Sequence, residues 1–192
     1  VLEKGRFDAV FLADVLGVYD VYKDSRDPAI INGVQVPAND PAFVIPVMAS
    51  VTKHLGFGLT ASTTHTHPYT FARKMSTLDH LTKGRIGWNI VTSYLNSAAK
   101  NIGLNQQIPH DERYEKADEY MEVVYKLWEA SWEDDAVVMD KARWIYTDPP
   151  KVHDISHDET SDQVRGNQLC EPSQKRTPVI FQAGASTRGR AF

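Results

Sequence analysis

Short apolar runs alternate with amphipathic stretches along this chain, and the alternation restricts the possible folds more than any other feature. The apolar runs are continuous, which is typical of strands that are buried on both faces of a parallel sheet. A repeated strand–helix–strand order predicts parallel strands that are joined by right-handed helical crossovers. The predicted strands cover residues 7–13, 56–63, 85–92 and 177–184.

Helices are predicted between the strands, where apolar residues recur with helical spacing. The helix over residues 68–83 is followed by Gly84, at a position where a left-handed C-cap is favoured. Pro41 lies near the first turn of another predicted helix, where its missing N–H is tolerated. The predicted helices cover residues 42–54, 68–83 and about 117–128.

The length of the chain limits how the strands can close. A (β/α)₈ barrel typically needs about 250 residues, and this chain has 192. The predicted α/β fold is therefore either an open sheet or roughly half of a barrel. A polar segment at about residues 132–176 interrupts the rhythm, and we expect an insertion with a short hairpin there. We expect residues 1–192 to form one domain of this kind.

Composition narrows the class of protein. The formal net charge is −4, which gives no basic surface for nucleic acid or for an anionic membrane. No apolar run approaches the roughly 20 residues of a membrane-spanning helix. Cys170 is the single cysteine, so no internal disulfide can form, and the cytoplasm is the expected location.

Residues that follow the predicted strands are the candidate site, because ligands bind at the carboxyl ends of strands in parallel α/β folds. Asp14 follows the first strand. Small residues surround Ser186 after the fourth, and Arg188 and Arg190 come next. Small residues let the backbone approach a ligand, and a helix beginning there would direct free N–H groups at an anion. The chain holds neither G-x-G-x-x-G nor a Walker A motif, so this turn predicts a phosphate site of another kind.

Two histidine pairs have the spacing of metal ligands. His65 and His67 would share one face of a strand, but no third ligand is close to them in the sequence. His153 and His157 lie in a polar stretch, where we expect solvated loop histidines. We therefore predict no metal site.

Five stretches of the sequence have a more specific pattern. They are FDAVFLAD, GLTASTTH, PYTFARKMSTLDHLTKGRIGWNIVTS, HDERYEKADEYMEVVYKLWE and VIFQAGAS, and residues 76–93 are the most specific part. In this order and spacing they resemble the nitrilotriacetate monooxygenase group of the bacterial-luciferase-like flavin monooxygenases. That group also includes dibenzothiophene-sulfone, pristinamycin and long-chain alkane monooxygenases.

The resemblance implies a luciferase-like (β/α)₈ TIM barrel, of which this chain holds a part, with FMN bound at its open end. Reduced FMN (FMNH₂), supplied by a separate flavin reductase, would react with O₂ to give a flavin hydroperoxide that inserts one oxygen atom into an organic small molecule. At full length such an enzyme is expected to be a homo-oligomer. No catalytic residue is implied. The family's FMN-contacting positions fall on Asp14, Thr60, Asn89, His110, Tyr114 and Ser186, with Tyr114 and Ser186 at the phosphate end and the others around the ring system.

The chain also departs from the family pattern. His65 stands where the family has Tyr, and residues 157–168 lack an aromatic-rich strand. Family members are longer, and they begin before Val1 and continue after Phe192. Two alternatives stay open: a deazaflavin-dependent oxidoreductase on the same barrel, and a catalytically inactive flavin-binding fragment. The flavin that copurifies and the full reading frame would distinguish them.

Overall fold

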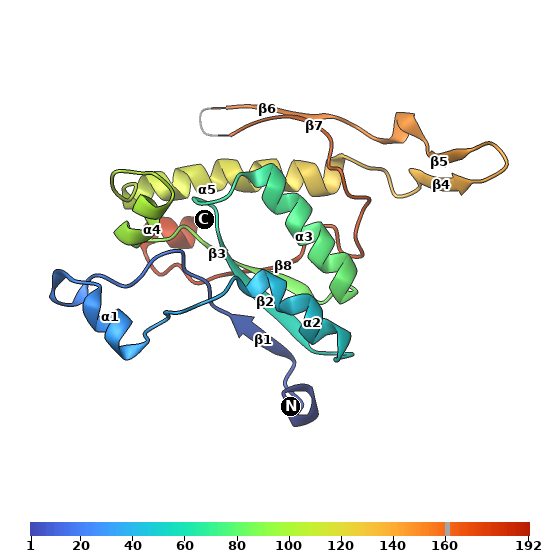
Figure 1. The fold of residues 1–192 in the computed structure, drawn as a ribbon. Coiled ribbons are helices and arrows are strands. Elements are labelled where there is room, and N and C mark those ends of the chain that lie inside the picture. Colours follow the sequence, from blue (N-terminus) through green and yellow to red (C-terminus); the bar gives the residue numbers. More distant parts are fainter. Residues whose placement is uncertain (160–161) are drawn as a thin grey trace.

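A four-stranded parallel sheet forms the centre of the computed structural model, which describes residues 1–159 and 162–192 (Figure 1). All neighbouring strands in this sheet pair in parallel, which confirms the predicted α/β arrangement. The strand order is β1-β2-β3-β8, so the last strand joins the edge formed by β3. The strands are β1 (Ala9–Leu12), β2 (Gly56–Ser62), β3 (Ile86–Val91) and β8 (Val179–Gln182).

The two faces of the central strands differ in chemistry. Phe57 and Leu59 on β2, like Trp88 on β3, are buried in the core. Alternate residues of a strand point to opposite faces, so the intervening positions face away from this core. There Gly58 pairs with Gly87 and Thr60 with Asn89. One face is thus an aromatic and aliphatic core, and the other is built from small and polar residues.

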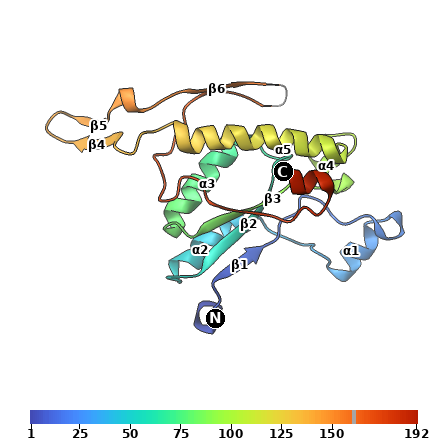
Figure 2. The ribbon, with the colours of Figure 1, turned by 180° about the vertical axis from the view of Figure 1, so that it is seen from behind.

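Helices cover the apolar face of the sheet. Phe71 on α3 lies 4.3 Å from Trp88, measured between ring centroids, and Tyr120 on α5 lies 6.2 Å from Trp88. Aromatic pairs at such separations add to the stabilisation that comes from burial alone. Both views show α3 between α2 and α5 (Figure 2). The bounds are α2 (Ile45–Ser50), α3 (Pro68–Thr82) and α5 (His110–Tyr125).

The helix predicted over residues 42–54 is wrong in its extent. The structure has a 3₁₀ turn, Pro41–Phe43, followed by the short α2. Pro46 has no N–H to donate to the carbonyl four residues earlier, so it is tolerated only in the first turn of a new helix. The helix predicted over residues 68–83 is confirmed as α3, and Gly84 follows it with φ +77°.

The polar segment forms two hairpins instead of one (Figure 2). Antiparallel pairing joins β4 (Val137–Asp140) to β5 (Ile145–Thr147), and β6 (Ile155–Asp158) to β7 (Gln163–Gly166). Short helices complete the fold: α1 (Asp27–Asn32), α4 (Asn96–Asn101) and α6 (Thr187–Ala191), with a π-helical turn, Lys126–Ala130, after α5. Within the described residues, no helix has the length and apolar character needed to cross a membrane.

Candidate functional site

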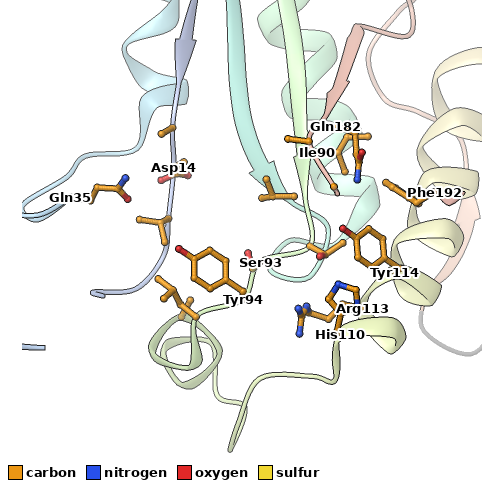
Figure 3. Close-up of a pocket in the computed structure, with 18 of the residues that line it drawn as sticks. Asp14, Gln35, Ile90, Ser93, Tyr94, His110, Arg113, Tyr114, Gln182 and Phe192 are labelled. Atoms are coloured by element: carbon orange, nitrogen blue, oxygen red, sulfur yellow. The ribbon is translucent and has the colours of Figure 1, made fainter. Parts of the chain in front are cut away.

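A cavity of about 390 Å³ opens at the carboxyl end of the sheet (Figure 3). Its walls come from the residues that follow β1, β3 and β8 and from the first turn of α5. The volume lies within the roughly 300–1,000 Å³ that small-molecule sites occupy. The position is the one where parallel α/β folds bind ligands, as the sequence predicted.

The six predicted site residues fall into three groups. Asp14, His110 and Tyr114 line the cavity directly. Ser186 adjoins the cavity through His110, because its Oγ lies 3.3 Å from His110 Nε2. Thr60 and Asn89 do not line it; Asn89 Nδ2 donates to Thr60 Oγ1 over 3.0 Å on neighbouring strands.

Asp14 supplies the acidic group of the cavity wall. Burial raises the pKa of the Asp14 carboxyl above its ordinary value, and repulsion from Asp40 raises it further. Both causes disfavour the charged form. A carboxyl in such a place can accept a hydrogen bond from a ligand N–H or hydroxyl, and a ligand donor there would stabilise its ionised form.

Tyr114 fixes the turn between β8 and α6 against α5. Its hydroxyl lies so close to two glycines that a Cβ added to Gly184 would be 2.8 Å away and one added to Gly189 would be 2.7 Å away. Real Cβ atoms do not approach so closely, so a side chain at either position would displace Tyr114. The Tyr114 ring also lies 5.6 Å from that of Phe192, centroid to centroid. The small residues of the predicted phosphate turn are therefore needed for packing as well as for access.

A chain of hydrogen-bonding groups leads to Ser186 at the rim of the cavity. Asp111 Oδ1 lies 2.6 Å from His110 Nδ1, and His110 Nε2 faces the Ser186 hydroxyl. The Ser186 oxygen also accepts from Gly189 N over 3.0 Å, so it is the N-cap of α6. The capping role is local helix chemistry, and it holds the hydroxyl in a defined place beside His110.

Arg113 was missed from the sequence, whereas two tyrosines in the cavity wall follow predicted strands. Tyr94 lines the cavity opposite the Tyr114 side, with its ring centroid 6.5 Å from that of Tyr19 (Figure 3). Arg113 lines it one turn into α5, next to the predicted Tyr114. The helical spacing from His110 could have indicated Arg113, since residues three apart share one face. Tyr19 follows the first predicted strand and Tyr94 the third, at the end of the sheet where the site was expected.

His157 was predicted as a solvated loop residue, and this is wrong. It lies on β6 with 3% of its surface exposed. Its Nε2 is 3.4 Å from Glu119 Oε1, and its Nδ1 is 3.3 Å from Lys126 Nζ. Strand alternation buries Ile155 and His157 on one side of the hairpin, and the polar sequence around them gave no sign of this. His153, by contrast, is exposed and contacts Glu133.

The histidines do not form a metal site with the candidate cavity. Among the described residues, Glu119, His157 and Glu159 place one possible ligand atom each within 4.8 Å of one another. None of these three residues lines the candidate cavity, and the ammonium of Lys126 lies beside His157. His67 instead caps α3, where Tyr69 N donates to its Nδ1 over 3.3 Å. Burial lowers the pKa of His65, which favours its neutral form.

The side chains of the cavity wall suit a planar ligand with an anionic tail. Its walls combine aromatic rings, amide and hydroxyl groups, one carboxylate and one guanidinium. The carboxylate of Asp14 and the guanidinium of Arg113 lie on opposite sides of the cavity (Figure 3). A ligand with hydrogen-bond donors at one end and negative charge at the other would match this polarity.

Comparisons with known proteins agree with this description. The family model for luciferase-like monooxygenases matches residues 1–192. The long-chain alkane monooxygenase of Geobacillus thermodenitrificans is 63% identical over 192 residues, covering 100% of this chain and 44% of that protein. Nitrilotriacetate monooxygenase component A of Aminobacter aminovorans is 38% identical over 98% of this chain and 42% of its own length.

Solved structures give the same picture. The crystal structure of a long-chain alkane monooxygenase superposes with a TM-score of 0.96, covering 98% of this chain and 44% of the other. A riboflavin lyase crystallised with modified FMN and riboflavin is 46% identical, with a TM-score of 0.88 over 95% of this chain and 41% of its own. The chain thus has the luciferase-like fold and spans less than half the length of these relatives.

Proposed function

Because the chain belongs to the luciferase-like monooxygenase family, we propose that it forms the flavin-binding part of an FMNH₂-dependent monooxygenase. The observation that carries the proposal is the cavity at the carboxyl end of the sheet, where Asp14, His110 and Tyr114 converge. The relative that was crystallised with modified FMN and riboflavin supports the flavin as the ligand. The names of the alkane and nitrilotriacetate relatives support monooxygenation as the reaction.

The cavity residues fit FMN. The walls offer Tyr19 and Tyr94 beside a ring system, and the turn that begins at Gly184 brings backbone and the Ser186 hydroxyl to the rim. In this proposal Ser186 and Tyr114 hold the phosphate end, while Asp14 and His110 lie nearer the ring system. Thr60 and Asn89 would lie near the ring system on the polar face of the sheet, where Asn89 donates a hydrogen bond to Thr60.

Bound and reduced FMN would supply the oxygen chemistry, so the chain's own task is to bind, orient and shield. The Asp14 carboxyl, whose pKa is raised by burial, can accept from a ligand N–H and so fix the direction of the ring. Tyr114, wedged against Gly184 and Gly189, keeps the phosphate turn in place. The aromatic and aliphatic walls would shield a bound flavin from water, which limits side reactions of its oxygen chemistry.

The partners follow from the same family membership. We infer that a separate reductase supplies FMNH₂, because relatives such as nitrilotriacetate monooxygenase component A are named as parts of systems with several components. The substrate would be an organic small molecule, with O₂ as the oxidant. We also infer a cytoplasmic protein, since one free cysteine suits a reducing compartment, and a homo-oligomer in its complete form.

The test is to purify the protein from its full reading frame and to identify the flavin that it binds. FMN should bind more tightly than a deazaflavin, as measured by quenching of flavin fluorescence. Photoreduced FMN, O₂ and candidate substrates should then give oxygenated product. Tight binding of a deazaflavin with no affinity for FMN would contradict the proposal, and so would FMN binding with no oxygenation across a broad substrate set.

A further inference from the structure

Arg113 is a buried charge without a counter-charge. It is 8% exposed, and one of its guanidinium nitrogens, Nη1, donates to the backbone carbonyl of Ile108. Its Nε is buried and has no hydrogen-bond partner. Within the described part of the chain, no carboxylate lies within 4.0 Å of this side chain. Burying an unpaired charge is costly, so an anion is the expected missing partner.

The charge of Arg113 persists despite its burial. Burial lowers the pKa of the Arg113 guanidinium below its ordinary value, but an arginine in a protein stays protonated at neutral pH. The side chain therefore cannot relieve its desolvation by losing a proton, as a lysine could. It must be compensated by a partner that enters the site.

The position of Arg113 says where that partner would lie. Among the described residues of the cavity wall, Arg113 is the only lysine or arginine side chain and Asp14 is the only carboxylate. Arg113 shares the first turns of α5 with His110 and Tyr114, which border the β8–α6 turn (Figure 3). Partial positive charge at the N-terminus of α5 also favours an anion at this end of the cavity.

Two other arginines lie beside this turn: Arg190 is exposed to solvent, and Arg188 is already compensated. Arg188 pairs with Asp118 and lies over the Tyr114 ring, 5.8 Å from its centroid. Its charge therefore needs no ligand. Arg113 differs because, within the described residues, its side chain makes one hydrogen bond, to the Ile108 carbonyl, and this uses a single donor of the five that a guanidinium carries. The remaining donors are available to a planar or tetrahedral anion.

We propose that Arg113 binds the phosphate of FMN, and this inference rests on the proposed flavin site. A guanidinium presents a fork of donors that matches phosphate oxygens with two parallel hydrogen bonds. Arg113 would thus set the preference of the site for FMN over riboflavin, which has the same ring system without the phosphate. Its partners there would be Ser186 and Tyr114.

The test compares FMN with riboflavin in the protein expressed from its full reading frame. Arg113→Gln should weaken FMN binding by about 10- to 100-fold, the loss of a hydrogen bond between charged groups. Riboflavin binding should change little in the same variant. Arg113→Lys keeps the charge but loses the fork of donors, so its FMN affinity should lie between those of the wild type and Arg113→Gln. Arg143→Gln, the same charge change on an exposed arginine, is the matched control and should leave both affinities unchanged.

Inorganic phosphate gives a second measurement that needs no glutamine variant. It should compete with FMN but not with riboflavin in the wild-type protein, and compete less in Arg113→Lys. Equal losses of FMN and riboflavin affinity would overturn the proposal, because they would assign Arg113 to the loop at Ile108 alone. Unchanged FMN affinity would also overturn it. A wild-type protein that binds neither flavin would refute the proposed function itself, and this inference with it.

Discussion

Phe11 and Phe181 lie on the two edge strands of the sheet, yet their rings meet edge to face with centroids 5.2 Å apart. They can meet because the central strands carry Gly58 and Gly87 in the same row. A Cβ at Gly58 would lie 2.7 Å from the Phe11 ring, and a Cβ at Gly87 would lie 2.9 Å from the Phe181 ring. The two glycines therefore leave room for an aromatic layer on the face of the sheet opposite the helices.

This layer predicts that Gly87→Ala destabilises the protein more than Gly58→Ala. At Gly58 the nearest atoms belong to the Phe11 ring alone, which is 52% exposed and can move aside. At Gly87 the new Cβ would also lie 3.1 Å from the Val179 carbonyl oxygen, which is backbone and cannot. Overpacking of this kind costs about 1–3 kcal/mol. Urea unfolding of both variants measures the difference, and equal midpoints would contradict the prediction.

The same face predicts the behaviour of residues 1–192 when expressed alone. Phe11 and Phe181 are 52% and 41% exposed, and both edge strands leave backbone groups unpaired. Open edges and exposed apolar surface favour association. We expect this chain to dimerise or aggregate at micromolar concentration, as followed by sedimentation velocity. A monomer that melts cooperatively at high temperature would show that the exposed layer is tolerated.

Much of the fold could be predicted from the sequence, because strands that are buried on both faces have a strong local pattern. The runs at residues 56–63 and 85–92 correspond to β2 and β3 within one residue at each end. The predictions were wrong where contacts between distant segments determine whether a residue is buried. The burial of His157 depends on a hairpin packing beside Lys126, and no periodicity in a polar stretch indicates such packing.

The candidate site was predicted in part, and the difference again has a physical cause. Asp14 directly follows a predicted strand, so the rule for parallel sheets placed it at the cavity. The positions of His110 and Tyr114 came from family resemblance, and the spacing alone would have given only a helix start. Arg113 was missed because a charged residue in a helix is usually solvated. Its side chain is held by the loop at Ile108, which no pattern in the helix indicates.

Glu3 predicts a loss of stability in acid. Its carboxylate accepts backbone N–H groups from Lys53, His54 and Leu55 at 2.7–3.1 Å, and these bonds lower the pKa of Glu3 from 4.5 to about 2. A folded-state pKa below the unfolded value stabilises the protein above pH 4.5, and the contribution disappears as pH falls towards 2. Glu3→Gln should therefore destabilise the protein at pH 7 and have much less effect near pH 2.

Urea titrations at several pH values would measure this difference between wild type and Glu3→Gln. Glu171→Gln, whose carboxylate has no such backbone bonds among the described contacts, is the matched control. High salt should reduce the Glu3 effect, because the carboxylate is partly exposed and its interactions are screened. If Glu3→Gln destabilised the protein equally at pH 7 and pH 2, the charge of the Glu3 carboxylate would not be the cause of the stabilisation.

Ser186→Ala should weaken FMN binding by about 10- to 100-fold if Ser186 bonds the phosphate, since a hydrogen bond to a charged group is lost. The substitution also removes the N-cap of α6, which costs about 1 kcal/mol of local stability. Riboflavin separates the two effects, because it needs the turn but has no phosphate. Ser186→Thr keeps the hydroxyl and should retain most of the FMN affinity. An unchanged FMN dissociation constant in Ser186→Ala would remove Ser186 from the site.

The last prediction concerns the source of electrons. We expect the protein, expressed from its full reading frame, to use FMNH₂ from a separate reductase and not to oxidise NADH itself. Enzymes that bind NADH often have a glycine-rich turn directly after a strand and, about 20 residues later, an acid that binds the ribose. No strand in this sequence is followed by that pattern. The carboxyl end of the sheet would also have to hold both flavin and substrate, so a nicotinamide would compete with them for the same site.

Stopped-flow absorbance tests this expectation directly. When the protein is mixed with FMN and NADH alone, the flavin should stay oxidised for much longer than one catalytic turnover takes in the presence of a reductase. Addition of an unrelated flavin reductase should start NADH oxidation and, with O₂ and substrate, product formation. Photoreduced FMN should replace the reductase, which shows that the flavin and not a protein complex carries the electrons. Rapid bleaching of bound FMN by NADH without any reductase would contradict the two-component arrangement and indicate a self-sufficient flavin oxidoreductase.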